Sequence, residues 1–305
     1  MTTEQTTNTT SVLRTLSNQM ADAVERISAA LVVVNGRQRQ PASGVVYAQD
    51  VILTANHVLE RADQITVQTH DKRTLSAQVI GRDAATDLAV LRVANLGLQP
   101  AQAAEEQARV GQLVIALGRN PTDGPMASVG IVSTVSGPLR TERGGTLERY
   151  IRTDAIPYPG FSGGPLIDAA GRIVGVLTTG LIDGIPLAIP LNIAAQIADT
   201  LTSQGVVKRG YLGISSQLIE LPTAQRAGRD NEHGLLIIKV EEKSPAQQAG
   251  VLIGDILLTL DGHALKDAED LHLVLSGERV GKTIPLEVIR GDALQTLNIT
   301  VGQRN

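Results

Sequence analysis

The stretch YPGFSGGPLID, from Tyr158 to Asp168, places one serine among three glycines and two prolines. Glycine adopts backbone dihedral angles closed to other residues and leaves its N–H group uncovered. A serine nucleophile beside an oxyanion site needs both properties. A glycine-rich turn is the ordinary alternative for such a segment. The rest of the sequence has to distinguish an active-site loop from a plain turn.

Composition bounds the class of protein. The 305 residues suffice for about two domains of ordinary size. Hydrophobic residues make up 42% of the chain but aromatic residues only 2%, so the cores have to be aliphatic. The net charge of −4 argues against nucleic acid as a partner. The absence of cysteine excludes disulfides and thiol chemistry, and no apolar run approaches the roughly 20 residues of a membrane span.

The N-terminal region divides into two parts. Residues 1–11 are polar and threonine-rich, and we expect them to form a disordered tail. From Leu13 to Leu31 the apolar residues recur every three or four positions, which predicts an amphipathic helix. The polar start carries no export signal. We therefore expect a cytoplasmic protein, or a periplasmic or otherwise extracytoplasmic one if an export signal has been removed.

Two units follow this helix. Between residues 31 and 190, short β-branched runs alternate with turn signals, which favours a mostly β architecture of paired barrels or a sandwich. A helix is predicted after residue 190, with Gly205 as its stop. Beyond a boundary near 205–210 the pattern restarts on a smaller scale. Strands, a short helix capped by Ser244, and a helix over 267–277 predict a compact α+β unit.

A serine nucleophile requires a general base, and histidine with an orienting carboxylate is the usual choice. His57 ends the apolar run VILTANHVL, and Asp87 opens the apolar run DLAVLRV. A structural histidine and a strand-end cap are the ordinary alternatives for these two residues. The order His57, Asp87, Ser162 on a strand-rich chain is typical of the chymotrypsin-like double barrel. Four other histidines sit in polar or second-unit segments and are expected to face solvent: His70, His233, His263 and His272.

A second motif overlaps the same serine. Residues 160–164 also fit G-x-S-x-G, the nucleophile turn of α/β-hydrolases. That fold needs a helix directly after the serine and a histidine later in the same domain. Here Pro165 and a short apolar run follow, and the later histidines belong to the second unit. The α/β-hydrolase interpretation is therefore disfavoured.

Six segments carry a resemblance to a known family. TANHV, TDLAVL and PGFSGGPL resemble the three catalytic blocks of the HtrA (high-temperature requirement) serine proteases. RGYLGI, VEEKSPAQQAG and GDILLTLDG resemble the single PDZ domain that follows the protease in that family. The resemblance covers roughly residues 20–305. It implies a mostly β fold, with a chymotrypsin-like double β-barrel protease domain over 12–205 and an α+β PDZ domain over 210–305.

The resemblance also implies roles in the protease domain. Ser162 would be the nucleophile, His57 the general base and acid, and Asp87 the carboxylate that orients the imidazole. The oxyanion hole would consist of the backbone N–H groups of Gly160 and Ser162, with Phe161 between them. One such donor is typically worth about 10² to 10³ in rate.

This chain departs from the family at two positions. The family usually has NPGNSGGP, whereas Tyr158 and Phe161 stand here in place of two asparagines. The Phe161 ring either packs below the loop or changes the conformational equilibrium of the loop. Ile156 is expected at the base of the primary specificity pocket, with Thr178 in its wall. Such a pocket would be shallow and apolar, and would accept small aliphatic residues.

In the second unit the resemblance implies a peptide-binding groove. The loop YLGI would receive a peptide C-terminus on its backbone N–H groups, and the peptide would add as a strand beside it. Two leucines of the following helix would line the pocket for the last side chain, with a plain core role as the alternative. The residues assigned to peptide binding are Tyr211, Leu212, Gly213, Ile214, Leu271 and Leu275.

Together these observations predict an ATP-independent serine endopeptidase that acts on unfolded or damaged protein. The PDZ domain would bind substrate or regulatory peptide C-termini. We expect no metal and no cofactor, no nucleic-acid partner and no membrane span, and assembly as a homotrimer or a multiple of it. The alternatives are a proteolytically silent chaperone or peptide-binding scaffold of the same fold, and an esterase.

Overall fold

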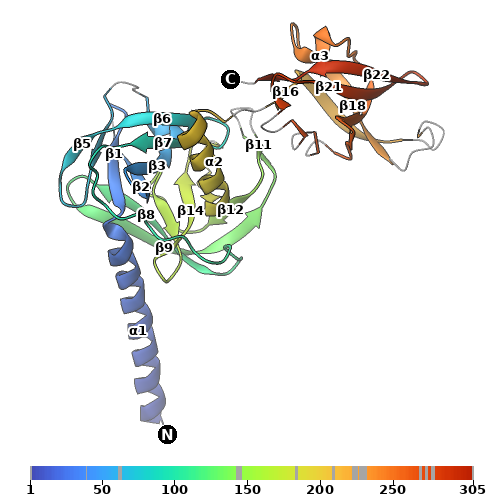
Figure 1. Ribbon diagram of the computed structural model, residues 1–305. Coiled ribbons are helices and arrows are strands. Elements are labelled where there is room, and N and C mark those ends of the chain that lie inside the picture. The colour runs from blue at the N-terminus through green and yellow to red at the C-terminus, as the bar shows by residue number, and fades with distance from the viewer. Residues whose placement is uncertain are drawn as a thin grey trace. The chain divides into compact units, whose positions relative to one another are not determined.

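The computed structural model describes residues 2–38, 40–60, 64–141, 146–182, 185–207, 210–221, 226, 232–267, 270–271, 274–275 and 279–303. Two compact units divide between Val207 and Lys208, and each is described by itself (Figure 1). In its described residues, the first unit holds a seven-stranded sheet, a closed six-stranded barrel, a two-stranded ribbon and two α-helices. The described part of the second unit holds a six-stranded sheet, a two-stranded pair and a short helix (Pro245–Gln248).

The first sheet has seven strands in the order β5-β4-β1-β2-β3-β7-β6. Every neighbouring pair is antiparallel. The edge strands β5 and β6 are separated along the chain by Ala77 alone, so the sheet curls round on itself. The strands are β1 (Leu31–Asn35), β2 (Ala42–Ala48), β3 (Val51–Ala55), β4 (Thr66–Gln68), β5 (Thr74–Ser76), β6 (Gln78–Asp83) and β7 (Leu88–Arg92).

The second sheet is a closed barrel in the order β12-β15-β14-β13-β8-β9. Its strands are β8 (Leu113–Asn120), β9 (Gly124–Ser136), β12 (Tyr150–Thr153), β13 (Pro165–Ile167), β14 (Ile173–Thr178) and β15 (Leu187–Pro190), and a small ribbon pairs β10 (Leu139–Arg140) with β11 (Thr146–Leu147). The segment that holds Ser162 lies between β12 and β13. The mostly β, trypsin-like architecture expected from the sequence is confirmed.

Helix α2 (Leu191–Gln204) packs against both sheets of the first unit. It ends at Gly205, which adopts the left-handed conformation (φ +74°) and donates its N–H to the carbonyl of Leu201. Glycine is the natural residue at this position because it has no Cβ to clash. The helix and its stop are confirmed as predicted.

Helix α1 (Thr2–Ser28) corrects the expectation of a disordered tail over 1–11. The apolar repeat from Leu13 onward nucleates the helix, and each further residue then adds one hydrogen bond. Threonine costs less than about 1 kcal/mol per helical position, so the helix extends back through the polar start. The C-terminal part of α1 is anchored by Ala23 and Ile27, which are buried in the core of the first unit.

The second unit has a sheet in the order β17-β18-β19-β21-β22, with β17 at one edge. Its elements are β16 (Gly210–Tyr211), β17 (Ile214–Glu220), β18 (His233–Val240), α3 (Pro245–Gln248), β19 (Ile256–Leu260), β20 (His263–Ala264), β21 (Thr283–Arg290), β22 (Ala293–Thr300) and β23 (Gly302–Gln303). Ser244 caps α3 by accepting from the Gln247 N–H, as expected. The helix expected over 267–277 lies mostly outside the described residues.

A buried carboxylate ties this unit together. Asp255, which directly precedes β19, is buried and accepts from Arg290 Nε at 2.8 Å, from Arg290 Nη2 at 2.7 Å and from the Leu252 N–H at 2.8 Å. Burial raises the pKa of the Asp255 carboxyl, but the hydrogen bonds from Arg290 and Leu252 outweigh it and the net pKa falls below the ordinary 3.8. The ionised carboxylate therefore stabilises the fold.

We predict that Asp255→Asn lowers the free energy of unfolding of the second unit by about 3 kcal/mol at neutral pH, because it breaks a buried ion pair. A depressed carboxyl pKa contributes stability above its unfolded value of 3.8, and this contribution is lost as the pH falls through the folded pKa. The difference between wild type and variant should therefore shrink in acid. Amide hydrogen exchange of β19 and β21 in the full chain, across a pH series, measures it.

The matched control is Asp261→Asn, since the ion pair of Asp261 with Arg279 is equally short, at 2.7 Å, but its carboxylate side chain is 36% exposed. Solvent screening makes such pairs worth little. An equal loss in the two variants, or a difference that does not depend on pH, contradicts the role given to Asp255.

Candidate active site

His57 is placed by the end of an apolar strand. After β3 the chain enters a single 3-10 turn (Asn56–Val58), in which Val58 is buried and His57 keeps 15% of its side chain exposed. The His57 N–H donates to Asp87 Oδ1 at 2.9 Å, and the ring Nδ1 lies 2.6 Å from Asp87 Oδ2. A carboxylate accepts hydrogen bonds only, so Nδ1 carries the proton and Nε2 is left as the basic atom.

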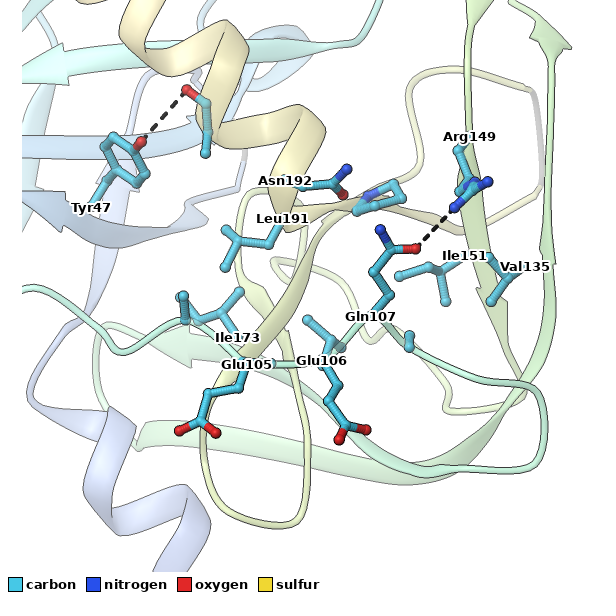
Figure 2. Close-up of a pocket in the computed structure, with 16 residues that line it drawn as sticks. Tyr47, Glu105, Glu106, Gln107, Val135, Arg149, Ile151, Ile173, Leu191 and Asn192 are labelled. Atoms are coloured by element: carbon cyan, nitrogen blue, oxygen red, sulfur yellow. Dashed lines mark hydrogen bonds between the residues drawn. The ribbon is translucent and has the colours of Figure 1, made fainter.

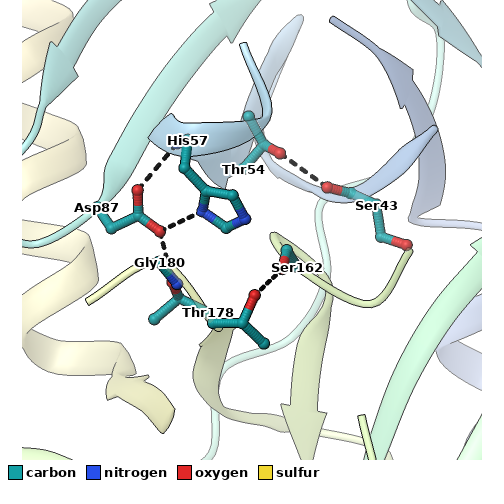
Figure 3. Close-up of polar contacts among 8 residues, drawn as sticks. Ser43, Thr54, His57, Asp87, Ser162, Thr178 and Gly180 are labelled. Carbon is teal, nitrogen blue, oxygen red and sulfur yellow. Dashed lines mark hydrogen bonds and ion pairs between the residues drawn. The ribbon is translucent and has the colours of Figure 1, made fainter. Parts of the chain in front are cut away.

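Asp87 is the most constrained residue of the site. It precedes β7 in the left-handed conformation (φ +58°), and its side chain is 0% exposed. The hydroxyl of Thr178, at the end of β14, donates to the same Oδ2 that His57 contacts. A buried charge is tolerated only when it is paired and hydrogen-bonded. The donors from the two sheets meet that condition (Figure 3).

Ser162 lies in the same constellation as His57 and Asp87. Its Oγ is 3.2 Å from Thr179 Oγ1, and the next residue, Gly180, packs directly on the histidine and the carboxylate. A Cβ at Gly180 would stand 2.5 Å from His57 Nδ1 and 2.7 Å from Asp87 Oδ2. Within the described residues Ser162 forms no hydrogen bond to His57, and Figure 3 draws no dashed line between these two side chains. The Ser162 hydroxyl contacts that of Thr179 instead.

The nucleophile loop rests closely on the first sheet. Gly163 has φ +83°, and a Cβ there would stand 2.3 Å from the Ser43 carbonyl oxygen and 2.4 Å from Thr54 Oγ1. The Ser43 N–H donates to the Ser162 carbonyl at 3.1 Å. Only glycine satisfies both the dihedral angle and the close approach. The glycine at position 163 is therefore required by the contact between the two sheets.

The segment before the serine forms a tight turn. The Phe161 N–H donates to the Tyr158 carbonyl at 3.0 Å, and Gly160 has φ +96°, as the third residue of a type II turn requires. The Ser43 hydroxyl donates to the Gly160 carbonyl at 2.7 Å. Over the part of the chain that the structure describes, no backbone carbonyl accepts from the N–H of Gly160 or Ser162. These two donors are available to a ligand.

The two residues expected in the specificity pocket differ in exposure and in hydrogen bonding. Ile156 exposes 59% of its surface and is held through its N–H, which donates to Ser128 Oγ at 2.9 Å. Thr178 is buried, and its hydroxyl donates to Asp87, so its side chain belongs to the hydrogen-bond network of the carboxylate, while its place in the pocket wall stays a prediction. A buried threonine at a strand end next to a charged site needs its hydroxyl satisfied, which explains the placement.

Sequence reasoning missed the role of Ser43. This serine is buried in the apolar strand ASGVVYA, and its hydroxyl links the Gly160 carbonyl to the Arg119 N–H, 2.9 Å away. A polar residue inside a buried strand is a recognisable signal, because it has to find partners. The sequence alone could not reveal that those partners lie in the nucleophile loop and in β8.

In the second unit, the loop YLGI leads into the edge strand β17. Gly213 has φ +78°, and a Cβ there would stand 2.2 Å from the Ser244 Cβ, so glycine is required. In the described part of this unit, no backbone carbonyl accepts from the N–H of Leu212 or Gly213. The Tyr211 hydroxyl donates to Glu241. The N–H groups of Leu212 and Gly213 are donors of the kind that a carboxylate requires. They lie beside β17, an edge strand to which a further strand can add.

Leu271 and Leu275 are both buried in the hydrophobic cluster of the second unit, together with Leu212 and Val274. Ile214, at the start of β17, is partly buried against the same cluster. The structure thus brings the expected groove leucines and the YLGI loop together. It gives the leucines a core role in the unliganded protein.

A separate hollow of about 480 Å³ lies in the first unit (Figure 2). Its lining combines Ile151, Ile173 and Leu191 with the Arg149 guanidinium, which donates to Gln107 Oε1 at 2.9 Å. On its margin, burial and the hydrogen bond to Asp199 raise the pKa of Tyr47 to about 12. None of His57, Asp87 and Ser162 lines it, so it is distinct from the site that these three residues form.

Two further features bear on partners. In the described ranges, no group of three histidine or acidic side chains is placed to hold a metal ion. Among the helices that the structure describes, none combines the length and the apolar character needed to cross a bilayer.

Comparison with known proteins matches both units. Residues 42–176 match the model of the trypsin-like peptidase domain, and residues 210–301 match the model of the PDZ domain. The chain is 35% identical over 276 residues to a probable periplasmic serine endoprotease DegP-like protein of Pseudomonas savastanoi pv. phaseolicola, and 32% identical over 277 residues to one of Ectopseudomonas mendocina. These matches cover 87% and 88% of this chain but only 57% and 58% of the relatives, so the chain spans little more than half their length.

Solved structures agree over almost the whole chain. The HtrA-type protease AlgW with tripeptide is 31% identical with a TM-score of 0.79, and the match covers 94% of this chain and 97% of AlgW. The serine endoprotease from Yersinia pestis is 29% identical with a TM-score of 0.76, and the match covers 94% of this chain and 98% of that structure. With its trypsin-like peptidase unit followed by one PDZ unit, the chain belongs to the HtrA family of serine proteases.

Proposed function

We propose that this chain is a serine endopeptidase in which Ser162, His57 and Asp87 form the catalytic triad. The observation that supports this most directly is the buried Asp87 carboxylate, which binds both the N–H and the Nδ1 of His57 and so fixes the imidazole with Nε2 toward the reaction. A carboxylate that served only as a strand cap would not need the ring contact. The proposed chemistry is acyl transfer through a covalent intermediate.

In the first half of the reaction the Ser162 hydroxyl turns from Thr179 toward His57. Oγ attacks the scissile carbonyl carbon and forms the C–O bond, while its proton passes to His57 Nε2. Asp87 stabilises the resulting imidazolium, and Thr178 holds the carboxylate in place. Catalytic hydrogen bonds are often absent or long without substrate, so the contact between Ser162 and Thr179 is compatible with this step.

The oxyanion of the tetrahedral intermediate accepts from the N–H groups of Gly160 and Ser162, which donate to no backbone carbonyl of the described residues. The intermediate then collapses, the C–N bond breaks, and the leaving amine takes the proton from His57. Water, deprotonated by the same histidine, hydrolyses the acyl-enzyme and regenerates Ser162. Ile156, exposed six residues before the nucleophile, offers an apolar surface to the side chain before the cut. We propose a preference for small aliphatic residues there.

We propose that the PDZ unit binds the C-termini of unfolded or damaged polypeptides. The donors of Leu212 and Gly213 would hold the terminal carboxylate, and the peptide would pair with the edge strand that begins at Ile214. Leu271 and Leu275 would form the apolar contact for the last side chain after a small rearrangement of the core. Tethering through this unit raises the local substrate concentration without any change in the triad.

We propose an extracytoplasmic compartment for this activity. The relatives are named as periplasmic proteins, and the expectation of a cytoplasmic protein is not supported. The N-terminal sequence could not report the compartment, because a polar start says nothing about processing that precedes it.

We also propose that the chain self-associates through α1 into a homotrimer or a multiple of it. Val12, Leu13 and Leu16 are 62%, 63% and 36% exposed on this helix. Leu13 and Leu16 continue a heptad spacing that includes Ala23 and Ile27, the anchors of the helix in its own domain. A second copy of the same stripe is the partner that this spacing fits.

For the purified chain we predict degradation of β-casein by the wild type and none by Ser162→Ala. Loss of a triad member typically lowers kcat on the order of 10⁴ to 10⁶-fold, so the contrast is unambiguous. Gel electrophoresis follows the loss of casein, and mass spectrometry of the products identifies the residue before each cut. We expect cuts after valine, alanine and isoleucine.

Thr200→Ala is a suitable control, because its hydroxyl bonds within α2 only, and it should leave the rate unchanged. Absence of cleavage by the wild type, together with no labelling of Ser162 by a fluorophosphonate, would favour the silent scaffold. Ester hydrolysis without casein cleavage would favour the esterase. Cuts only after lysine or arginine would contradict the apolar pocket.

A peptide that ends in a hydrophobic residue with a free carboxylate should bind the PDZ unit, and the same peptide with a C-terminal amide should bind at least about tenfold more weakly. The reason is that the amide removes the charge that the Leu212 and Gly213 donors would accept, and a hydrogen bond to a charged group is worth about 1.5–3 kcal/mol. Fluorescence anisotropy on the full chain with Ser162→Ala measures both peptides without cleavage. Equal affinities would contradict carboxylate recognition.

Substitution of Leu13 and Leu16 together by glutamate should shift the chain from oligomer to monomer, because charges in the α1 stripe oppose its pairing. Sedimentation velocity measures the change. The control is a glutamate at Thr15, which is exposed on the same helix but lies outside the heptad stripe. An oligomer that survives the double substitution, or a wild type that sediments as a monomer, argues against α1 as the interface.

A further inference from the structure

We propose that Phe161 is a positioning residue that sets the oxyanion hole through the packing of its ring. The proposal rests on the proposed peptidase function and adds to it the group that holds the hole in shape. Phe161 is the only phenylalanine in the chain and is among its largest fully buried side chains. It stands between the two residues, Gly160 and Ser162, whose N–H groups would bind the oxyanion.

The backbone of Phe161 is held on both sides. Its N–H donates to the Tyr158 carbonyl at 3.0 Å, and its carbonyl accepts from the Gly164 N–H at 2.8 Å. The Cα of Phe161 is therefore a fixed point from which the two oxyanion donors extend in opposite directions along the chain. A displacement of the ring would move this point and both donors with it.

The ring fits a notch in β8 that a glycine creates. A Cβ built on Gly118 would stand 2.3 Å from Phe161 Cδ1, 2.8 Å from Cε1 and 3.0 Å from Cγ. Gly118 has no positive φ, so its backbone would accept an alanine. Glycine at position 118 is therefore needed because the ring of Phe161 occupies the space of a side chain, and not because the strand needs an unusual dihedral angle there.

A second aromatic ring closes the turn over Phe161. The centroid of the Tyr158 ring lies 5.6 Å from that of Phe161 at an interplanar angle of 77°, an edge-to-face contact. Such pairs add stabilisation beyond the buried area alone. Tyr158 also supplies the carbonyl that accepts from Phe161, so the same two residues close the turn through backbone and side chain. These are the two positions at which the chain departs from the usual asparagines.

The residue after the notch completes the arrangement. The Arg119 N–H donates to the Ser43 hydroxyl at 2.9 Å, and that hydroxyl donates to the Gly160 carbonyl at 2.7 Å. Gly118 and Arg119 thus hold the oxyanion loop from adjacent positions of β8, one by packing and one by a hydrogen-bond relay. The Gly160 carbonyl accepts from the Ser43 hydroxyl, and the Phe161 N–H of the same peptide unit donates to the Tyr158 carbonyl, so this peptide unit is held at both ends.

If Phe161 positions the donors, its truncation should act on the transition state and not on substrate binding. For Phe161→Ala we expect kcat on a short chromogenic peptide to fall about 10²-fold, the effect of one lost oxyanion donor, with KM changed less than about threefold. A peptide aldehyde forms an adduct that places an oxyanion in the hole. Its inhibition constant should rise by a similar factor. Phe161→Leu, which still fills part of the notch, should retain kcat within about tenfold.

Two further variants separate positioning from general loss of packing. Val132→Ala removes a buried side chain of the same cluster from β9 and should leave kcat unchanged while it lowers the melting temperature. Gly118→Ala should lower kcat in the wild-type background, because its methyl group displaces the ring. Combined with Phe161→Leu, the same methyl group should have little further effect. The comparison of Gly118→Ala in the wild-type and Phe161→Leu backgrounds does not require Phe161→Ala to fold.

The outcomes distinguish the two levels of the proposal. A wild type that neither turns over the peptide nor reacts with a fluorophosphonate at Ser162 overturns the peptidase function itself. An active wild type in which Phe161→Ala keeps kcat and aldehyde affinity overturns the positioning role alone. Equal losses of kcat in Val132→Ala and Phe161→Ala, or a Gly118→Ala defect that Phe161→Leu leaves unchanged, show a merely structural contribution.

Discussion

The burial of the Asp87 carboxylate is the constraint on which the rest of the first unit depends. Its side chain has no contact with water, and removal of a charge from water costs several kcal/mol unless donors compensate. The donors come from the turn after β3 and from the end of β14, which are parts of different sheets. The two sheets therefore cannot separate or slide without leaving a buried charge uncompensated.

The glycines of the nucleophile loop follow from the same contact between sheets. The chain passes so close to β2 and β3 at Gly163, and to β8 at Gly164, that a side chain at either position would overlap backbone or side-chain atoms. At Gly163 the obstacles are the Ser43 carbonyl and the Thr54 hydroxyl, and at Gly164 it is the Leu117 carbonyl. Close approach thus places Ser162 at the boundary between the sheets, where the end of β3 also delivers His57.

Much of the fold of the first unit was predictable from the sequence, because it follows from patterns among residues that are close in the chain. Alternating β-branched runs predicted the strands, Gly205 predicted the end of α2, and the order of His57, Asp87 and Ser162 predicted the type of site. The start of α1 was not predictable in this way, because the cooperativity of a helix extends it beyond its apolar repeat. Propensity averaged over the threonine-rich start points to a coil, whereas an anchored helix propagates through it.

The roles of Thr178 and Ser43 were hidden for a different reason. Each is a hydroxyl whose partner lies far along the chain, 91 residues away for Thr178 and 117 for Ser43. A sequence shows that a buried hydroxyl needs a partner but not which partner the fold supplies. The expectation of a pocket wall at Thr178 used only its neighbours in the chain, and these do not show that its hydroxyl donates to the Asp87 carboxylate.

The oxyanion loop shows how a chemical requirement on the backbone can be met by a side chain that takes no part in the chemistry. The reaction demands only two N–H groups, so the side chain at position 161 is free to vary provided that it holds the loop. An asparagine there would need polar partners, and the cluster around Phe161 is aliphatic, with Val114, Ala116 and Leu166 among its members. A ring in a glycine notch instead fixes the loop by shape, and close-packed cores admit few alternative fits.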